Sequence, residues 1–341
     1  MLTRLDRFLG GIWQNFVRQS KQSSRIFTVL FVVGLCLSVS IAPLYERNLS
    51  FAQNPPSNQI RIGYQKYGTL NLLKARGHLE ERYKSKNVSV QWILFPGGPQ
   101  LLEALNTGSI DFGHTGEAPP IFAQAAGAPL VYVANSPPSP KNEGILVHQD
   151  SGIKTIADLK GKKVALNKGS NVHFFLVKAL EAANVKYSDI KTVFLPPAEA
   201  RAAFENKNVD AWVIWDPFYT AGKKATNARI LKDAEGLAAN REFYLASRPF
   251  LKQYPDRVKA ILADTLKADT WAKGNITAAA NLLSPQLGIE APVLADALKR
   301  KAFGIQQPPD FKVVAYQQQI ADTFLKLGLL PKPVNVRDAL Q

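Results

Sequence analysis

The chain has 341 residues, of which 46% are hydrophobic and 20% are charged. These values are typical of a folded protein with one or two hydrophobic cores, and they exclude a chain that is disordered throughout. The formal net charge is +15 at pH 7, which is compatible with anionic ligands or an acidic membrane surface, although solvated surface lysines are the simpler explanation. No basic stretch alternates with aromatic residues as in a nucleic-acid groove, so we expect no nucleic-acid partner.

The first fifty residues resemble an export signal. Five basic residues precede an apolar run at 26–42, and Ser50 and Ala52 supply small side chains at positions −3 and −1 of a cleavage site. We therefore predict a signal peptide over 1–52 and a periplasmic protein. The alternative is a retained membrane anchor, because the apolar run is close to the roughly 17-residue minimum for crossing a bilayer. The single cysteine, Cys36, lies in this segment, so the exported chain would need no disulfide.

Beyond a polar linker at 53–59, strand-like and helix-like segments alternate, which predicts an α/β protein with parallel strands. Thr155 and Asp158 form a capping box ahead of Leu159. From about residue 248 the strand signal stops, and two amphipathic stripes predict long helices, one through Val258, Ile261, Leu262 and Leu266 and another through Val314, Ala321, Phe324 and Leu327. The predicted strands are 60–64, 88–94, 110–113, 130–134, 144–147, 163–166, 192–195, 209–215 and 243–246.

A weak internal repeat indicates two similar lobes. A shift of 99 residues superposes 104–119 on 203–218, matching Asp111 to Asp210 and Glu117 to Asp216. A shift of 102 residues superposes the strand at 61–66 on 163–168, with Lys66 over Lys168. Two matches at similar offsets favour duplicated halves over chance agreement.

If the two lobes face each other, the loops at the carboxyl ends of their strands line one cleft. The candidate loops are 63–69, 114–120, 167–173 and 214–218. Three of them place Gly-Ser/Thr or Thr-Gly just before a helix, where backbone amides and a hydroxyl group bind an anion at the positive end of the helix dipole. The alternative is that Thr69 and Ser170 are only structural N-caps.

Several side chains in these loops have two possible roles. Trp215 and Asp216 offer an aromatic wall beside a charge, although such aromatic residues also fill cores. Glu117 and Asp216 could face each other as an acid/base pair, or hold a ligand or a closed state. His173, in the first turn of its helix, either donates to an anion or is a surface residue. The histidines lack metal-ligand spacing and no dinucleotide or phosphate fingerprint occurs, so we expect no metal and no cofactor.

The combination of these segments closely resembles the aliphatic-sulfonate-binding proteins of ABC importers. The resemblance covers most of 60–335 and lies in the runs IRIGYQK, FPGGPQLLEALNTGSIDFGHTGEAPPIFAQAAGAPLVYV, IKTIADLKGKKVALNKGS and NVDAWVIWDPFY. It implies a type II periplasmic binding protein fold, in which two α/β lobes are joined by two hinge strands and the ligand cleft lies between the lobes. The first lobe would comprise 58–146 plus 245–341, and the second 147–244.

The resemblance also implies a site and partners. The sulfonate would lie among backbone amides and hydroxyl groups, with its alkyl tail toward the aromatic wall, and importer permease subunits with their ATPase would receive it from a monomeric, non-enzymatic binder. Asn171, Val172 and Glu117 depart from the usual family residues and bear on which sulfonate fits. The alternatives are another small anion, such as nitrate or a sulfate ester, or an enzyme on the same fold. The implied ligand contacts are Gln65, Gly116, Glu117, Ser170, Asn171, His173, Trp215 and Asp216.

Overall fold

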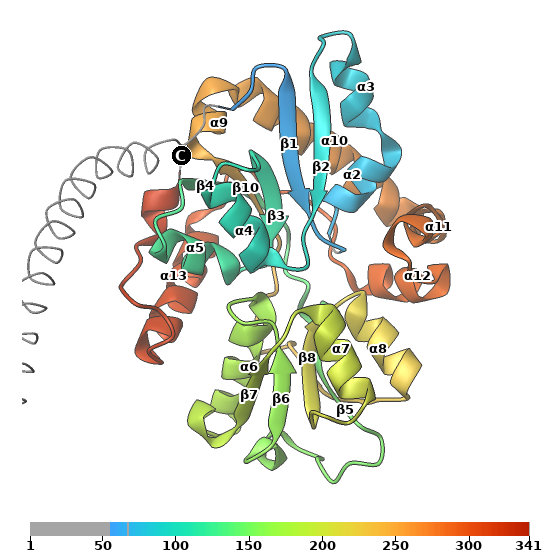
Figure 1. Cartoon of the computed structure of the whole chain (residues 1–341), viewed down its shortest axis with the longest axis vertical. Helices are drawn as coiled ribbons and strands as arrows, with labels where there is room; N and C mark the ends of the chain where they lie inside the picture. Colours follow the sequence, from blue (N-terminus) through green and yellow to red (C-terminus); the bar gives the residue numbers. More distant parts are fainter. Residues whose placement is uncertain (1–54, 67, 341) are drawn as a thin grey trace, which may run out of the picture. The chain divides into compact units, whose positions relative to one another are not determined.

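The computed structural model describes residues 55–66 and 68–340. The predicted signal peptide, the possible anchor at 26–42 and Cys36 lie outside the described residues. Residues Asn54–Gln341 form one compact unit, which contains two five-stranded sheets (Figure 1). No helix among the described residues is both long and apolar enough to cross a membrane.

The first sheet has the order β2-β1-β3-β10-β4. Strands β1 to β3 run parallel to one another, and β10 is antiparallel to both of its neighbours. The strands are β1 (Gln59–Tyr64), β2 (Ser89–Leu94), β3 (Phe112–Thr115), β4 (Leu130–Asn135) and β10 (Phe243–Ser247), and the helices between them are α2 (Leu70–Arg76), α3 (His78–Lys84), α4 (Gly98–Asn106) and α5 (Pro119–Ala125).

The second sheet has the order β7-β6-β8-β5-β9. Strands β6, β7 and β8 pair in parallel, and β5 is antiparallel to β8 and β9. The elements are β5 (Glu143–Val147), β6 (Lys163–Leu166), β7 (Lys191–Phe194), β8 (Ala211–Trp215), β9 (Arg229–Asp233), α6 (Asn171–Ala182), α7 (Pro197–Glu205) and α8 (Phe218–Thr226). Each position in this order has its counterpart in the first sheet.

An equivalent hydrogen bond from a backbone N–H to an aspartate occurs in each of the two sheets. The Asp111 carboxylate accepts from the Arg61 backbone N–H at 2.9 Å, and the Asp210 carboxylate accepts from the Lys163 backbone N–H at 2.7 Å. These residues are the partners that the shifts of 99 and 102 residues superpose. The predicted repeat is therefore confirmed as two structurally equivalent halves.

The C-terminal helices cover the first sheet. Side chains from α10, α11 and α12 share a core with α2 and α3, while α13 contributes to the other core, which also contains α4, α5 and the second sheet. Figure 1 shows α13 (red) near α5 and shows α11 and α12 (orange) on the side of α2. The helices are α9 (Arg248–Gln253), α10 (Pro255–Gly274), α11 (Ile276–Leu287), α12 (Ala291–Arg300) and α13 (Phe311–Lys326).

All nine predicted strands are present, with ends within two residues of the expected ones. The prediction missed β9, a half-exposed edge strand with only two apolar residues in its five. The predicted capping box is confirmed at the short helix Ile156–Leu159. The two amphipathic stripes are buried except for Leu266 and Leu327, which end their stripes and are 37% and 36% exposed.

The chain passes between the sheets twice, through residues 136–142 after β4 and through 234–242 after β9. Because β5 belongs to the second sheet and β10 to the first, the predicted boundaries at 146 and 244 fall inside these strands. The predicted linker likewise overlaps β1 at Gln59.

Candidate functional site

Loops from the two halves meet at glycines. A methyl group added to Gly116, in the loop between β3 and α5, would lie 2.7 Å from the side-chain oxygen of Asn171, at the start of α6. Gly97, just before α4, leaves equally little room beside Asn167. Because only glycine lacks a Cβ, these two positions allow the backbone of the first half to approach the second half closely.

Asn171 connects this contact to both crossing segments. Its side-chain amide donates to Glu143 Oε2 at 2.5 Å and to Asn240 Oδ1 at 3.0 Å. Glu143 follows the first crossing directly, and Asn240 lies within the second. Asn171 therefore joins the first turn of α6 to the two crossing segments, which would bend if the halves moved apart.

Two buried glutamates lie at this contact. Glu117 Oε2 accepts from the Arg241 backbone N–H at 3.2 Å, and the Glu117 backbone carbonyl accepts from Gln317 at 2.8 Å. Burial raises the pKa of Glu117 to about 7. Burial, followed by the nearby Glu117 charge, raises the pKa of Glu143 well above its usual value. The second carboxyl oxygen of each glutamate is buried without a hydrogen-bond partner among the described residues.

Gln65 and Ser170 lie near the facing loops, but their side chains bond within their own halves. The Gln65 side-chain amide donates to the His114 carbonyl at 2.9 Å. The Ser170 hydroxyl donates to the Asn167 carbonyl at 2.7 Å and makes no cap to α6. The Ser170 hydroxyl hydrogen and one hydrogen of the Gln65 amide are therefore used within their own halves in this conformation.

His173 is not a surface residue, and both of its ring nitrogens bond within the second half, so neither is offered to an anion in this conformation. It is fully buried, and its Nδ1 accepts from the Gly169 backbone N–H at 3.1 Å. The ring proton consequently resides on Nε2, which faces the Tyr187 hydroxyl at 2.7 Å. Burial, and then the charge of Lys168, lowers the pKa of His173 to about 4, and the ring packs against Phe324 of α13. His173 is thus a buried, neutral residue that packs behind the turn at Gly169.

Trp215 ends β8, and Asp216 follows it directly. Trp215 is opposite Glu143 in the β5–β8 ladder, and its ring contacts Phe218 edge-on. Asp216 accepts from Arg300 at 2.6 Å and from the Thr220 hydroxyl at 2.6 Å. After burial, the charge of Glu117 raises the pKa of Glu143, so the carboxyl group that interacts with Glu117 is that of Glu143, whereas Asp216 pairs with Arg300.

The sequence reasoning missed Glu143, Asn240 and Gln317. A signal was available for two of them. Glu143 is the first residue of β5 and the only charged residue in that strand, and Gln317 lies three residues after Val314 on the buried stripe of α13. Buried polar residues at such positions have partners in tertiary structure. Asn240 lies in an irregular crossing segment, where no periodicity marks burial.

Together the duplicated sheets and the facing loops define a class, the two-lobed α/β solute-binding proteins. Known proteins agree. The NMT1/THI5-like family model matches residues 81–278. An aliphatic sulfonates-binding protein of Escherichia coli (strain K12) is 47% identical over 283 residues, which are 82% of this chain and 88% of that relative.

Two solved structures share the fold over nearly their whole length. The alkanesulfonate-binding protein SsuA from Xanthomonas axonopodis pv. citri, bound to MOPS, has 41% identity and a TM-score of 0.80, covering 84% of this chain and 99% of its own. The periplasmic aliphatic sulphonate binding protein SsuA from Escherichia coli has 46% identity and a TM-score of 0.75, covering 84% and 92%. The chain belongs to the NMT1/THI5-like family and, within it, to the aliphatic-sulfonate-binding proteins. The resemblance seen in the sequence and the two-lobed fold class are confirmed.

Proposed function

We propose that the protein is the solute-binding component of an ABC importer, which captures aliphatic sulfonates in the periplasm and delivers them to permease subunits with their ATPase. The observation that carries this proposal is the contact of Gly116 with Asn171, because the Asn171 side chain is hydrogen-bonded to Glu143 and Asn240 at the two crossing segments. The 41–47% identity to sulfonate binders supports it. The two halves act as lobes that hinge at 136–142 and 234–242.

The anion site of this proposal is formed by backbone amides. Ser170 and Asn171 begin α6, a 12-residue helix whose N-terminal N–H groups carry partial positive charge. Gly116 lies against Asn171 from the other lobe, and we assign its amide and that of Glu117 to the same site. A sulfonate presents three oxygens, so it can accept from both lobes at once, and its affinity for the closed form shifts the equilibrium toward closure.

We further propose that the protein binds its ligand without converting it, since fold alone does not decide this. Glu117 and Glu143 share a buried site that raises the pKa of both. His173 is neutral and uses both ring nitrogens internally, and Asp216 is neutralised by Arg300. These groups are arranged to maintain a conformation, not to activate a nucleophile or to transfer a proton to a ligand.

Calorimetry on the purified protein with ethanesulfonate, taurine, nitrate and a sulfate ester tests the function. We expect sulfonate binding without turnover, and loss of at least tenfold in affinity in Gly116→Ala, because the added methyl meets Asn171. Gly152→Ala is the matched control, since nothing lies within 4 Å of the added methyl there. Binding of nitrate in preference to every sulfonate would redirect the proposal to an inorganic anion, and turnover abolished by Glu117→Gln would show an enzyme.

A further inference from the structure

Helix α12 belongs to the first half and has an ion pair to the second half at each of its ends. At its C-terminal end, the Arg300 guanidinium donates to the carboxylate of Asp216 at 2.6 Å. At its N-terminal end, Glu290 directly precedes the helix and accepts from the Lys224 ammonium of α8 at 3.3 Å. No other ion pair in the described part of the chain joins the first half to the second. The charged contacts between the halves are therefore concentrated on α12.

The two pairs differ in burial. The side chains of Lys224 and Glu290 are 62% and 75% exposed, so water and salt screen their attraction. The Asp216 side chain is only 3% exposed, and both Nε and Nη2 of Arg300 donate to it. A buried carboxylate depends strongly on its partner, because the charge has little water to solvate it. The pair of Arg300 with Asp216 is therefore the one able to affect the relative position of the halves.

The two residues that follow Arg300 bind the two crossing segments. The Lys301 ammonium donates to Glu242, at the end of the second crossing, at 2.9 Å. The Ala302 backbone N–H donates to the Ser139 hydroxyl oxygen, in the first crossing, at 2.9 Å. These bonds fix the end of α12 at both segments that would bend if the halves moved apart. Arg300 is thus held at the hinge by its neighbours, whereas its partner belongs to the second half.

Asp216 is connected by hydrogen bonds to the facing loops. Its backbone N–H donates to the Asn142 carbonyl, in the first crossing, at 2.7 Å. The next residue of the crossing side is Glu143, which lies opposite Trp215 in the β5–β8 ladder and accepts from the Asn171 amide. A change at the pair of Asp216 with Arg300 can therefore reach Asn171 through the start of β5.

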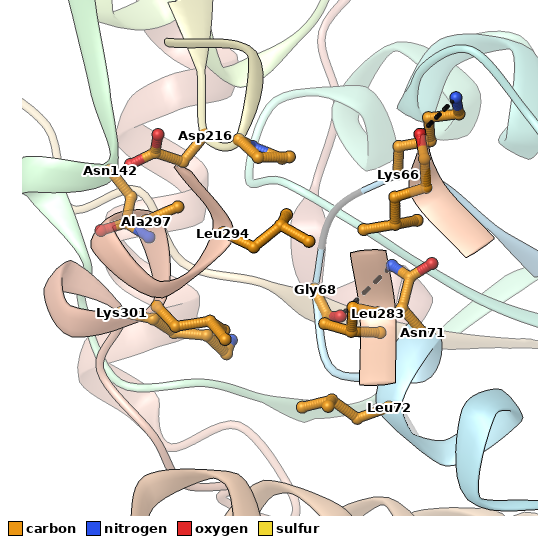
Figure 2. A pocket seen from close by; sticks show the side chains of 13 residues that line it. Lys66, Gly68, Asn71, Leu72, Asn142, Asp216, Leu283, Leu294, Ala297 and Lys301 are labelled. Carbon is orange, nitrogen blue, oxygen red and sulfur yellow. Dashed lines mark hydrogen bonds between the residues drawn. The ribbon is translucent and has the colours of Figure 1, made fainter. Parts of the chain in front are cut away.

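The surroundings of Asp216 are largely apolar (Figure 2). Figure 2 shows Asp216, Asn142 and Ala297 of α12 together at one side of a small pocket, and Lys301 follows Ala297 by one helical turn. Most of the remaining lining consists of leucines from α2, α11 and α12. Because apolar surface holds little water, the charges of the ion pair are weakly screened on this side.

From these contacts we propose that Arg300 is a positioning residue for solute capture, which holds the second half against α12 through Asp216 and so sets the fraction of the protein that is closed. The inference rests on the proposed function and adds to it a residue outside the facing loops. The ion pair is present in the same conformation as the contact of Gly116 with Asn171. Opening moves Asp216 away from α12, so the pair favours the closed form, and the apparent affinity for ligand rises with the closed fraction.

The test measures affinity and lobe distance in the same variants of the full protein. Calorimetry gives the affinity for ethanesulfonate. Pulsed electron paramagnetic resonance gives the distance between spin labels on Glu103→Cys in α4 and Glu199→Cys in α7, both at exposed positions. A residue that only stabilises the fold would change the melting temperature and leave both of these readouts unchanged.

Arg300→Met removes the charge and the donors while keeping an unbranched side chain. We expect the affinity for ethanesulfonate to fall about tenfold, and the mean label distance without ligand to increase. Arg300→Lys keeps a cation but offers a single ammonium in place of two guanidinium bonds, so its affinity should fall only about two- to threefold. Lys299→Met is the matched control, because its ammonium pairs with Asp296 of the same helix, and it should match the wild type in both readouts.

Other results would overturn the inference in distinguishable ways. A folded Arg300→Met variant with wild-type affinity and label distances overturns the positioning role and leaves sulfonate capture standing. Tighter binding in this variant also overturns it, since the pair would then favour the open form. A wild type that binds no sulfonate overturns the proposed function together with the inference. If Arg300→Met does not fold, the comparison of Arg300→Lys with Lys299→Met decides, and equal affinities in those two variants count against the role of Arg300.

Discussion

The side-chain amide of Asn171 donates a hydrogen bond to Glu143 across 2.5 Å, and both residues are buried. The bond joins the first turn of α6 to the segment where the chain enters the second sheet. Gly116, from the first half, packs against the same asparagine. Under the proposed function, a ligand held by the amides of these loops would therefore be linked through Asn171 to the crossing segments.

Replacing Asn171 tests this link. Asn171→Ala leaves Glu143 without its donor and Asn240 without its partner, and loss of a buried bond of this kind costs about 1–3 kcal/mol. We expect sulfonate affinity to fall about 5- to 100-fold by calorimetry. Asn208→Ala, at an exposed position of the same half, is the control and should bind normally. Equal sulfonate affinity of the two variants would show that Asn171 does not contribute to closure of the lobes.

The raised pKa of Glu117 predicts a dependence of stability on pH. Because the pKa of Glu117 is about 7 in the folded protein and 4.5 ordinarily, the folded protein binds more protons than the unfolded chain between these values. Stability is therefore greatest below about pH 4.5 with respect to this group, and is lost as the pH rises through 7, by roughly 3 kcal/mol at most. Glu143, whose pKa is also raised, acts in the same direction.

Urea unfolding between pH 5 and 8 measures this effect. Glu117→Gln should flatten the decrease in unfolding free energy over this range, because the amide stays neutral and still accepts from the Arg241 N–H. Glu103→Gln, on an exposed face of α4, should retain the wild-type slope. An unfolding free energy that rises with pH in the wild type and not in Glu117→Gln would reverse the assigned sign.

His173 is expected to stabilise the fold without contacting the ligand. His173→Phe removes the acceptor for Gly169 N–H and the partner of Tyr187, so the unfolding free energy should fall by about 1–3 kcal/mol. Sulfonate affinity at pH 7 should stay within about threefold of wild type. A tenfold or larger loss of affinity in a folded variant would instead make His173 a ligand contact.

The ion pair of Asp216 with Arg300 joins the end of β8 to α12. Arg300→Ala leaves a buried carboxylate with Thr220 as its remaining side-chain donor, and we expect a loss of about 3 kcal/mol in unfolding free energy. Lys299→Ala breaks only an exposed pair with Asp296 and should cost less than about 1 kcal/mol. Comparable losses in the two variants would show that Asp216 does not depend on its buried partner.

Much of the fold was predictable because local signals and tertiary structure agree. Each predicted strand is a short apolar run between turn residues, and Asp111 and Asp210 repeat because each accepts from the backbone of an equivalent strand, β1 in the first sheet and β6 in the second. The edge strand β9 was not predicted, because it is partly exposed to solvent and its sequence therefore has little apolar pattern.

The site was less predictable because side-chain direction depends on distant residues. Gly116, Glu117 and Asn171 meet as expected from the loops, yet His173 turns inward against Phe324, which lies 151 positions away in α13. Nothing local indicates that Asp216 would bind Arg300. The turns before α5 and α6 have local sequence signals, whereas the contact of Gly116 with Asn171 exists only when the two halves fold together.

The most direct test of capture between lobes is a distance between them. Spin labels on Glu103→Cys in α4 and Glu199→Cys in α7, both exposed, report this distance by pulsed electron paramagnetic resonance. The account predicts a broad distribution without ligand that becomes shorter and narrower with ethanesulfonate, and stays broad with sodium chloride. An unchanged distribution under conditions where calorimetry shows saturation with ethanesulfonate would contradict it.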